Sequence, residues 1–139
     1  MKRLRDSDDP LVHAGLYEWV LNKIDSDHPL YGVSYVGQVV RPHMSLQQAF
    51  EKRTAEEVAY SKRTPKYLGL YWAIQTFGVD AFTVQLIPNE KIHAPRVEAG
   101  TWANQREIQL IAERGGIMKD KDPDTHIQQT FNLTRGGQG

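Results

Sequence analysis

Two charged side chains interrupt the apolar stripes of predicted helices, and they are the first candidates for chemistry. In the helix predicted for residues 46–60, the apolar spacing continues by one turn onto Arg53, where another apolar residue is expected. In the helix predicted for residues 101–114, Glu107 lies on the same face as apolar residues one turn away. Burying such a charge without a partner costs several kcal/mol. Helical spacing alone favours a mutual Arg53–Glu107 ion pair or solvent contact over a functional cleft.

Two tyrosines, Tyr17 and Tyr35, fall in the two strands predicted nearest the N-terminus. Tyrosines on neighbouring strands are more often packing residues than catalysts. Their role therefore stays open on this evidence.

The elements that must position these four residues follow from periodicity. Residues 15–21 alternate as a half-buried strand does, with Leu16, Glu18 and Val20 on one side and Tyr17, Trp19 and Leu21 on the other. A second strand is predicted for residues 33–40. The turn-forming residues 25–29 between them predict an antiparallel hairpin with a long loop.

The rest of the chain is predicted to be mainly helical. Ser45 and Gln48 resemble a capping box, so the first helix begins near Leu46 and ends near Tyr60. An aromatic stripe (Tyr67, Leu70, Tyr71, Ile74, Phe77) predicts a second helix, ended by Gly78. A strand over 82–87 is stopped by Pro88, and Gly115 closes the helix over 101–114. The predicted order is ββααβα, an α+β fold.

Composition limits the class of protein. A chain of 139 residues with 40% hydrophobic residues suits one domain, so residues 1–139 are taken as a single unit. There is no cysteine, so a bound metal must be held by oxygen or nitrogen ligands, which favours Mg²⁺. No signal peptide or membrane-length apolar run is evident, which predicts a soluble intracellular protein without a membrane partner.

Charge is balanced overall but uneven locally. The 17 basic and 17 acidic residues cancel, which weakens any general attraction to a polyanion. Residues 41–66, however, contain six basic residues and only three acidic ones. This mixture is usually a solvated surface, but it also makes a local basic face for DNA an open alternative. The candidate DNA-binding residues are Arg41, Lys52, Lys62, Arg63 and Lys66.

Several short motifs, in order, resemble the GIY-YIG endonucleases. Gly15-Leu16-Tyr17 and Tyr35-Val36-Gly37 resemble the two strand motifs, and Phe50-Glu51-Lys52-Arg53 resembles the arginine helix. Residues 70–82, Asn104-Gln105-Arg106-Glu107-Ile108 and Phe131-Asn132-Leu133-Thr134-Arg135-Gly136-Gly137 resemble the later helix and strand, the glutamate helix and the asparagine-containing end. The resemblance spans residues 15–137 and is closest to phage-type and homing-type members.

The resemblance implies a small three-stranded antiparallel sheet flanked by three or more helices. It places a catalytic core at 14–137 after an N-terminal extension at 1–13. The catalytic positions that it implies are Tyr17, Tyr35, Arg53, Glu107 and Asn132.

Two features of this chain depart from the family pattern. The segment between the two strand motifs is longer than usual. The family often has a histidine one turn after the arginine, and here that place is Glu57. Glu57 is either an extra carboxylate near the metal or a surface partner of Arg53 at i,i+4 spacing, and the second interpretation is favoured.

The activity implied is metal-dependent hydrolysis of phosphodiester bonds in DNA. Tyr17 is expected to act as general base, with its pKa lowered from about 10 by Arg53 or the metal. Arg53 stabilises the phosphate, and Glu107 is the only protein ligand of a single Mg²⁺ or Mn²⁺. Tyr35 orients the water or phosphate, and Asn132 fixes the surrounding backbone. The sequence leaves open which tyrosine is the base.

Two other classes of function compete with this one. The first is a degenerate member of the family that binds nucleic acid without cutting it. The second is a protein-interaction domain whose charged residues are internal salt bridges. Within the nuclease interpretation, nicking or double-strand cleavage, sequence preference, and a monomer or a DNA-induced dimer all remain open, as does a phage, viral or mobile-element origin.

Overall fold

A three-stranded antiparallel sheet forms the centre of the molecule. The computed structural model describes residues 10–63, 69–118, 129–134 and 136. The strands are β1 (Leu11–Leu21), β2 (Ser34–Arg41) and β3 (Phe82–Pro95), in the order β2-β1-β3. The helices are α1 (Leu46–Ser61), α2 (Gly69–Phe77), the 3-10 turn η2 (Val79–Ala81) and α3 (Arg96–Glu113). The predicted α+β class and the predicted order of strands and major helices are confirmed.

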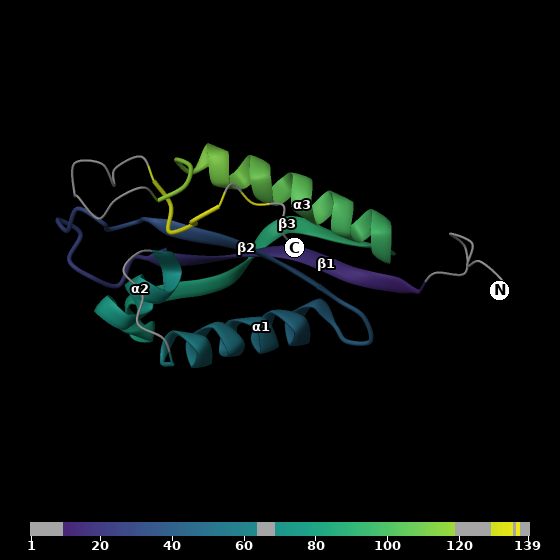
Figure 1. Cartoon of the computed structure of the whole chain (residues 1–139), viewed down its shortest axis with the longest axis horizontal. Coiled ribbons are helices and arrows are strands. Elements are labelled where there is room, and N and C mark those ends of the chain that lie inside the picture. The colour runs from purple at the N-terminus through teal and green to yellow at the C-terminus, as the bar shows by residue number, and fades with distance from the viewer. Residues whose placement is uncertain (1–9, 64–68, 119–128, 135, 137–139) are drawn as a thin grey trace.

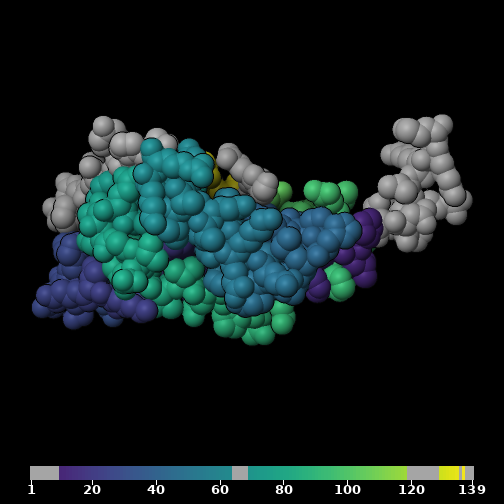
Figure 2. Space-filling view, turned by 90° about the horizontal axis from the view of Figure 1, so that it is seen from below, coloured from purple at the N-terminus to yellow at the C-terminus, as the bar shows by residue number. Residues whose placement is uncertain are grey.

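Helices cover both faces of the sheet. Figure 1 shows α3 on one face and α1 with α2 on the other. Seen from the side of α1, the sheet is largely hidden beneath α1 and α2 (Figure 2). The prediction that β1 is only half-buried is therefore wrong, because the central strand is covered on both sides. Leu16, Tyr17 and Trp19 are each at most 1% exposed.

The alternation along β1 divides its side chains between two cores. Tyr17, Trp19 and Leu21 pack with Phe50 of α1 and the apolar residues of α2. Leu16 packs on the other face with Val36, Leu110 and Ile111. The two sides assigned from the sequence are thus observed, and the buried side chains on each side of β1 pack against a different set of helices.

The third strand is longer than predicted, since Pro88 lies inside β3 and does not end it. The pairing with β1 shifts between Gly15↔Lys91 and Tyr17↔Leu86, which makes a bulge around Pro88 and Asn89. Asn89 has a positive φ of 67° in this bulge. A proline is tolerated here because β3 is an edge strand and bulged residues need not donate to a neighbour.

Two other boundaries differ from the predictions. Helix α3 begins at Arg96 instead of Thr101. Its first turn carries Val97, which is 76% exposed, so this turn lacks the apolar stripe that revealed the rest of the helix. Strand β1 begins at Leu11, so part of the N-terminal extension predicted for residues 1–13 belongs to the sheet.

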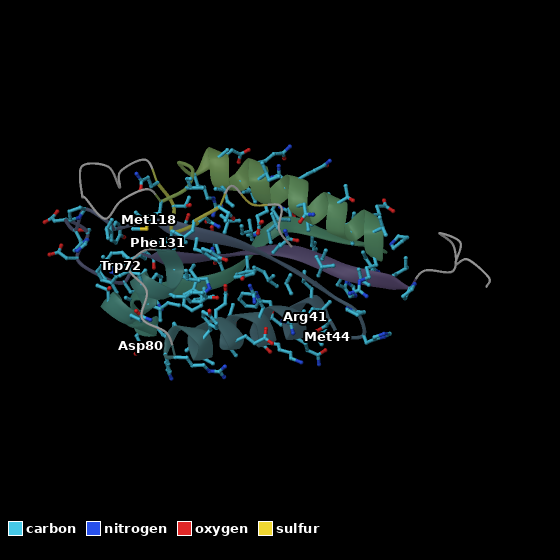
Figure 3. The ribbon with its side chains drawn as sticks, in the orientation of Figure 1. Arg41, Met44, Trp72, Asp80, Met118 and Phe131 are labelled. Carbon is cyan, nitrogen blue, oxygen red and sulfur yellow. The ribbon has the colours of Figure 1, made fainter. Side chains whose placement is uncertain are left out.

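The chain after α3 returns along the outer edge of β2. The backbone N–H of Phe131 donates to the Ser34 carbonyl over 2.8 Å. The Phe131 ring packs into the α2-side core, 6.5 Å from the ring of Trp72, and Figure 3 shows Met118 beside them. This return covers the first part of an otherwise unpaired strand edge. In the part of the chain that the structure describes, no helix is both long and apolar enough to cross a membrane.

Candidate active site

A cleft of about 850 Å³ lies at the outer edge of β2. It brings together all five site residues predicted from the sequence. Its described lining is Tyr17, Tyr35, Gln38, Val39, Val40, Arg41, Arg53, Tyr60, Leu70, Tyr71, Arg96, Gly100, Asn104, Glu107, Phe131, Asn132, Leu133 and Thr134.

The cleft joins side chains from opposite faces of the sheet. Tyr17 belongs to the core on the α1 side, and Tyr35 packs against that core. Gln38 pairs with Leu16 across the sheet, so its side chain faces α3, the helix that carries Glu107. Because β2 is an edge strand, the two sets of side chains can meet around its free edge. The tyrosines and the carboxylate thus share one cleft.

Gly37 allows Tyr17 to reach this edge. The two residues are directly paired, and the Tyr17 ring lies across the Gly37 backbone. A Cβ atom at Gly37 would be 2.3 Å from Cζ and 2.4 Å from the hydroxyl oxygen of Tyr17. Any side chain at this position would displace the Tyr17 ring. The missing side chain is therefore what lets the phenol extend over β2.

Both tyrosines are protonated in this environment. Burial raises the pKa of Tyr17 far above its usual value, and the Glu57 charge adds to this effect. Burial followed by the Glu57 charge also raises the pKa of Tyr35. Arg53 opposes these shifts in both residues and is outweighed. Arg53 thus acts on Tyr17 in the expected direction, but the expectation that the pKa of Tyr17 falls below its usual value is wrong, because burial and Glu57 outweigh Arg53.

Arg53 lines the cleft from α1 and is half-buried. Burial alone would lower its pKa, but the Tyr17 oxygen and the Glu57 carboxylate outweigh burial and raise it. The nearby carboxylate that acts on Arg53 is thus Glu57, one turn along the same helix. This differs from the Arg53–Glu107 ion pair considered from the sequence.

Glu57 is a core residue, so its assignment as a surface partner of Arg53 is wrong. It is 1% exposed, and its Oε1 accepts a hydrogen bond of 3.2 Å from Trp19 Nε1. Among the described residues, no donor meets Oε2 with full hydrogen-bond geometry, although the Tyr17 hydroxyl is close enough to affect the pKa of Glu57. Burial raises that pKa to about 7, against the opposing effects of Arg53, Tyr17 and Trp19.

Glu107 presents a carboxylate to the cleft from α3 while remaining 8% exposed. The amide of Gln38 donates to Glu107 Oε1 over 3.3 Å and to Asn104 Oδ1 over 2.8 Å. This amide orients the carboxylate. Within the described residues, no group of three or more His, Cys, Asp and Glu could hold a metal ion. A cation in this cleft would thus depend on Glu107 and on oxygen atoms of water and substrate.

Asn132 holds the strand that carries Tyr35. Its Oδ1 accepts from the Val36 N–H over 2.9 Å, and its Nδ2 donates to the Val36 carbonyl over 2.7 Å. The side chain therefore pairs with β2 as a neighbouring strand would. Asn132 is 5% exposed, so both of its hydrogen bonds to Val36 are buried. Buried hydrogen bonds of this kind hold the local backbone geometry. The contacts are those of a backbone-fixing residue.

The basic residues proposed for DNA binding separate into two groups. Arg41 lines the cleft and pairs with Glu56 over 2.6 Å. Lys52, Lys62 and Arg63 are exposed and lie outside the cleft lining. Lys66 lies outside the described residues, as do Tyr67, Arg135 and Gly137 of the sequence motifs.

Sequence reasoning missed several polar residues of the lining, among them Gln38, Asn104 and Arg96. Gln38 follows the second strand motif directly, and Asn104 lies one turn before Glu107 on the same helix face. These two positions could have been found by extending each motif along its element. Arg96 could not have been found in this way, because the first turn of α3 lacks the apolar spacing that predicts a helix.

The comparisons with known proteins identify no relative. No family model matches the sequence, and neither a curated protein nor a solved structure does. The geometry of the cleft therefore supplies the evidence on function.

Proposed function

We propose that the protein is a cation-dependent endonuclease of the GIY-YIG type that hydrolyses phosphodiester bonds in DNA, with the cleft at the β2 edge as its active site. The observation that carries this proposal is the convergence of Tyr17, Tyr35, Arg53 and Glu107 on one cleft. They come from four separate elements and from both faces of the sheet. Such convergence is not needed for packing.

The charge of the cleft suits a phosphate-bearing substrate. Its described lining carries three arginines, Arg41, Arg53 and Arg96, and one carboxylate, Glu107. A concentration of guanidinium groups around a single acid favours polyanion binding, even though the whole chain is neutral. The planar guanidinium of Arg53 can contact two phosphate oxygens and stabilise the charge that builds up in the transition state.

Each of the remaining residues has one task in the hydrolysis. Tyr17 accepts the proton of the attacking water, and Tyr35, between the influences of Arg53 and Glu107, orients the water or the phosphate. Gln38 keeps the Glu107 carboxylate facing the cleft. Asn132 keeps β2 in register with the returning chain.

Glu107 is the residue that would hold a divalent cation. A single carboxylate lining a roomy cleft suits Mg²⁺, or Mn²⁺ in its place, because Mg²⁺ commonly keeps several waters and binds through one or two carboxylates and substrate phosphates. When bound, the cation would supply positive charge against the phosphate oxygens and the departing 3′ oxygen.

The test is nicking of supercoiled plasmid with and without Mg²⁺. We expect conversion to the open circle by the wild-type chain and loss of at least about 100-fold in rate for Glu107→Gln and Arg53→Ala. Glu113→Gln is the matched control, because Glu113 is an exposed carboxylate on the same helix. Equal nicking by the Glu107 and wild-type chains would refute the proposal.

A second candidate function is DNA binding without cleavage. The raised pKa values of both tyrosines favour it, because a phenol with a raised pKa forms little phenolate at neutral pH. This candidate predicts salt-sensitive retardation of a DNA duplex by wild type with no nicked product at any Mg²⁺ concentration. A protein-interaction domain predicts neither retardation nor nicking.

A further inference from the structure

We infer that Glu57 acts through Tyr17 as the acceptor of its hydroxyl proton, so that cleavage requires ionised Glu57. This inference rests on the proposed nuclease function and deepens it. The feature behind it is a buried carboxylate, adjoining the candidate base, with one oxygen that the fold leaves without a full hydrogen bond.

The burial of Glu57 calls for a physical reason. At 1% exposure, the carboxylate has lost almost all contact with water. Trp19 Nε1 satisfies Oε1, but Oε2 has no full hydrogen bond from any described residue. A buried polar atom left in this state destabilises the fold, and more so when it is charged. If packing were the only role, an apolar residue would avoid that cost and a glutamine would avoid the buried charge.

The surroundings of Glu57 identify its partner. Glu57 interacts electrostatically with five charged or titratable groups. These are Arg53 and Glu56 of its own helix, Tyr17 of β1, Tyr35 of β2 and Tyr71 of α2. Of these, Tyr17 is the group whose hydroxyl is close enough to Glu57 to lower its pKa as a hydrogen-bond donor does. Tyr17 also lines the cleft, whereas Glu57 does not. Tyr17 therefore lies between Glu57 and the substrate.

The resulting proton path is balanced. The Tyr17 hydroxyl proton moves to Glu57 Oε2 as the phenolic oxygen takes a proton from the attacking water. The water oxygen forms its bond to phosphorus while the bond to the 3′ oxygen breaks, and that oxygen leaves with the electron pair and takes a proton from solvent. Glu57 later returns its proton to Tyr17, and Tyr17 releases the proton taken from water to solvent.

The titration range of Glu57 suits this exchange. A carboxyl with a pKa of about 7 is partly ionised at neutral pH and can both take and release a proton. An ordinary surface glutamate, ionised throughout this range, is a weaker proton acceptor. The expected consequence is that the rate of cleavage rises as pH increases through the pKa of Glu57.

The first arm of the test is a pH profile of single-turnover plasmid nicking between about pH 5.5 and 8.5. We expect Glu57→Gln to lose at least about 100-fold in rate at pH 8, and to lose the rise with pH. Glu57→Asp, which restores an acceptor, should recover part of the rate. Glu51→Gln, an exposed change on the same helix, should keep the wild-type profile. A Glu57→Gln chain with wild-type rate and profile would overturn the inference.

The second arm does not depend on catalysis. Because Trp19 Nε1 donates to Glu57, the ¹⁵N-indole resonance of Trp19 should titrate with a midpoint near 7 and stop titrating in Glu57→Gln. In Tyr17→Phe the midpoint should rise, since the Tyr17 hydroxyl lowers the pKa of Glu57. A midpoint that rises in Tyr17→Phe, in a chain that never nicks DNA, would overturn the nuclease proposal and leave the Glu57–Tyr17 contact intact. A midpoint that is unchanged in Tyr17→Phe would overturn the contact itself.

Discussion

Replacing Glu57 with glutamine should stabilise the fold at alkaline pH, even though it impairs the proposed activity. The glutamine carbonyl can still accept from Trp19 Nε1, so the hydrogen bond seen in the structure is retained. What disappears is the buried charge. A neutral amide removes the cost of ionising a group that is 1% exposed.

The size of this effect follows from the pKa of Glu57. The folded value is about 7 against an ordinary 4.5, a difference of 2.5 units. At about 1.36 kcal/mol per unit, the folded wild type loses roughly 3 kcal/mol relative to Glu57→Gln once pH exceeds 7. The sign follows from proton binding. Between pH 4.5 and 7 the folded state holds the proton more tightly than the unfolded state, so wild-type stability falls as pH rises.

The measurement is urea unfolding of wild type, Glu57→Gln and Glu51→Gln at about pH 5 and pH 8. Comparing each variant with wild type at the same pH cancels the titration of all other groups. The advantage of Glu57→Gln should be small at pH 5 and should grow to about 3 kcal/mol at pH 8. Glu51→Gln should show no such growth. A difference between Glu57→Gln and wild type that stays constant with pH would refute the assignment of Glu57 as a buried titrating acid.

Three further outcomes are expected. Gly37→Ala should displace the Tyr17 ring and lower the free energy of unfolding by about 1–3 kcal/mol, measured by urea titration. Asn132→Ala should cost about 1–3 kcal/mol in the same measurement, because both of its bonds to the β2 backbone are buried. Arg96→Ala should weaken duplex binding and reduce its salt slope by about 1, whereas Lys23→Ala, an exposed change outside the cleft, should leave the slope unchanged. An unchanged slope for Arg96→Ala would remove that end of the cleft from the DNA path.

Local patterns predicted much of the fold because the signals for α1, α2 and the two N-terminal strands lie within each segment. The capping box of Ser45 and Gln48 is present as expected. The errors occur where tertiary context decides. Pro88 is accommodated by a bulge that only the pairing with β1 reveals. The burial of both faces of β1 depends on helices that are distant in sequence.

In the candidate site, too, some residues were predictable from local sequence patterns and others depended on tertiary contacts. Arg53 and Glu107 were detectable because a charge in an apolar stripe needs an explanation. The role of Glu57 was not detectable. Its i,i+4 spacing from Arg53 is typical of a surface ion pair, and the sequence does not show that this face of α1 is buried. The Trp19 partner of Glu57 comes from another element, 38 residues away, and no local pattern records such a contact. The burial of Glu57, and not its spacing from Arg53, therefore sets its contacts and its raised pKa.

The unpaired edge of β2 explains why the cleft forms at this position. An exposed strand edge offers free N–H and C=O groups and invites pairing with other chains. Here the returning chain covers the edge at Ser34 and Val36, and α1 and α3 flank the remainder at Gln38 and Arg41. The strand is therefore open only where a substrate can reach side chains from both sheet faces at once. A central strand could not do this, because its two faces are separated by neighbours on either side. The edge position of β2 is thus what lets Tyr17 and Glu107, which face opposite helices, line the same cleft.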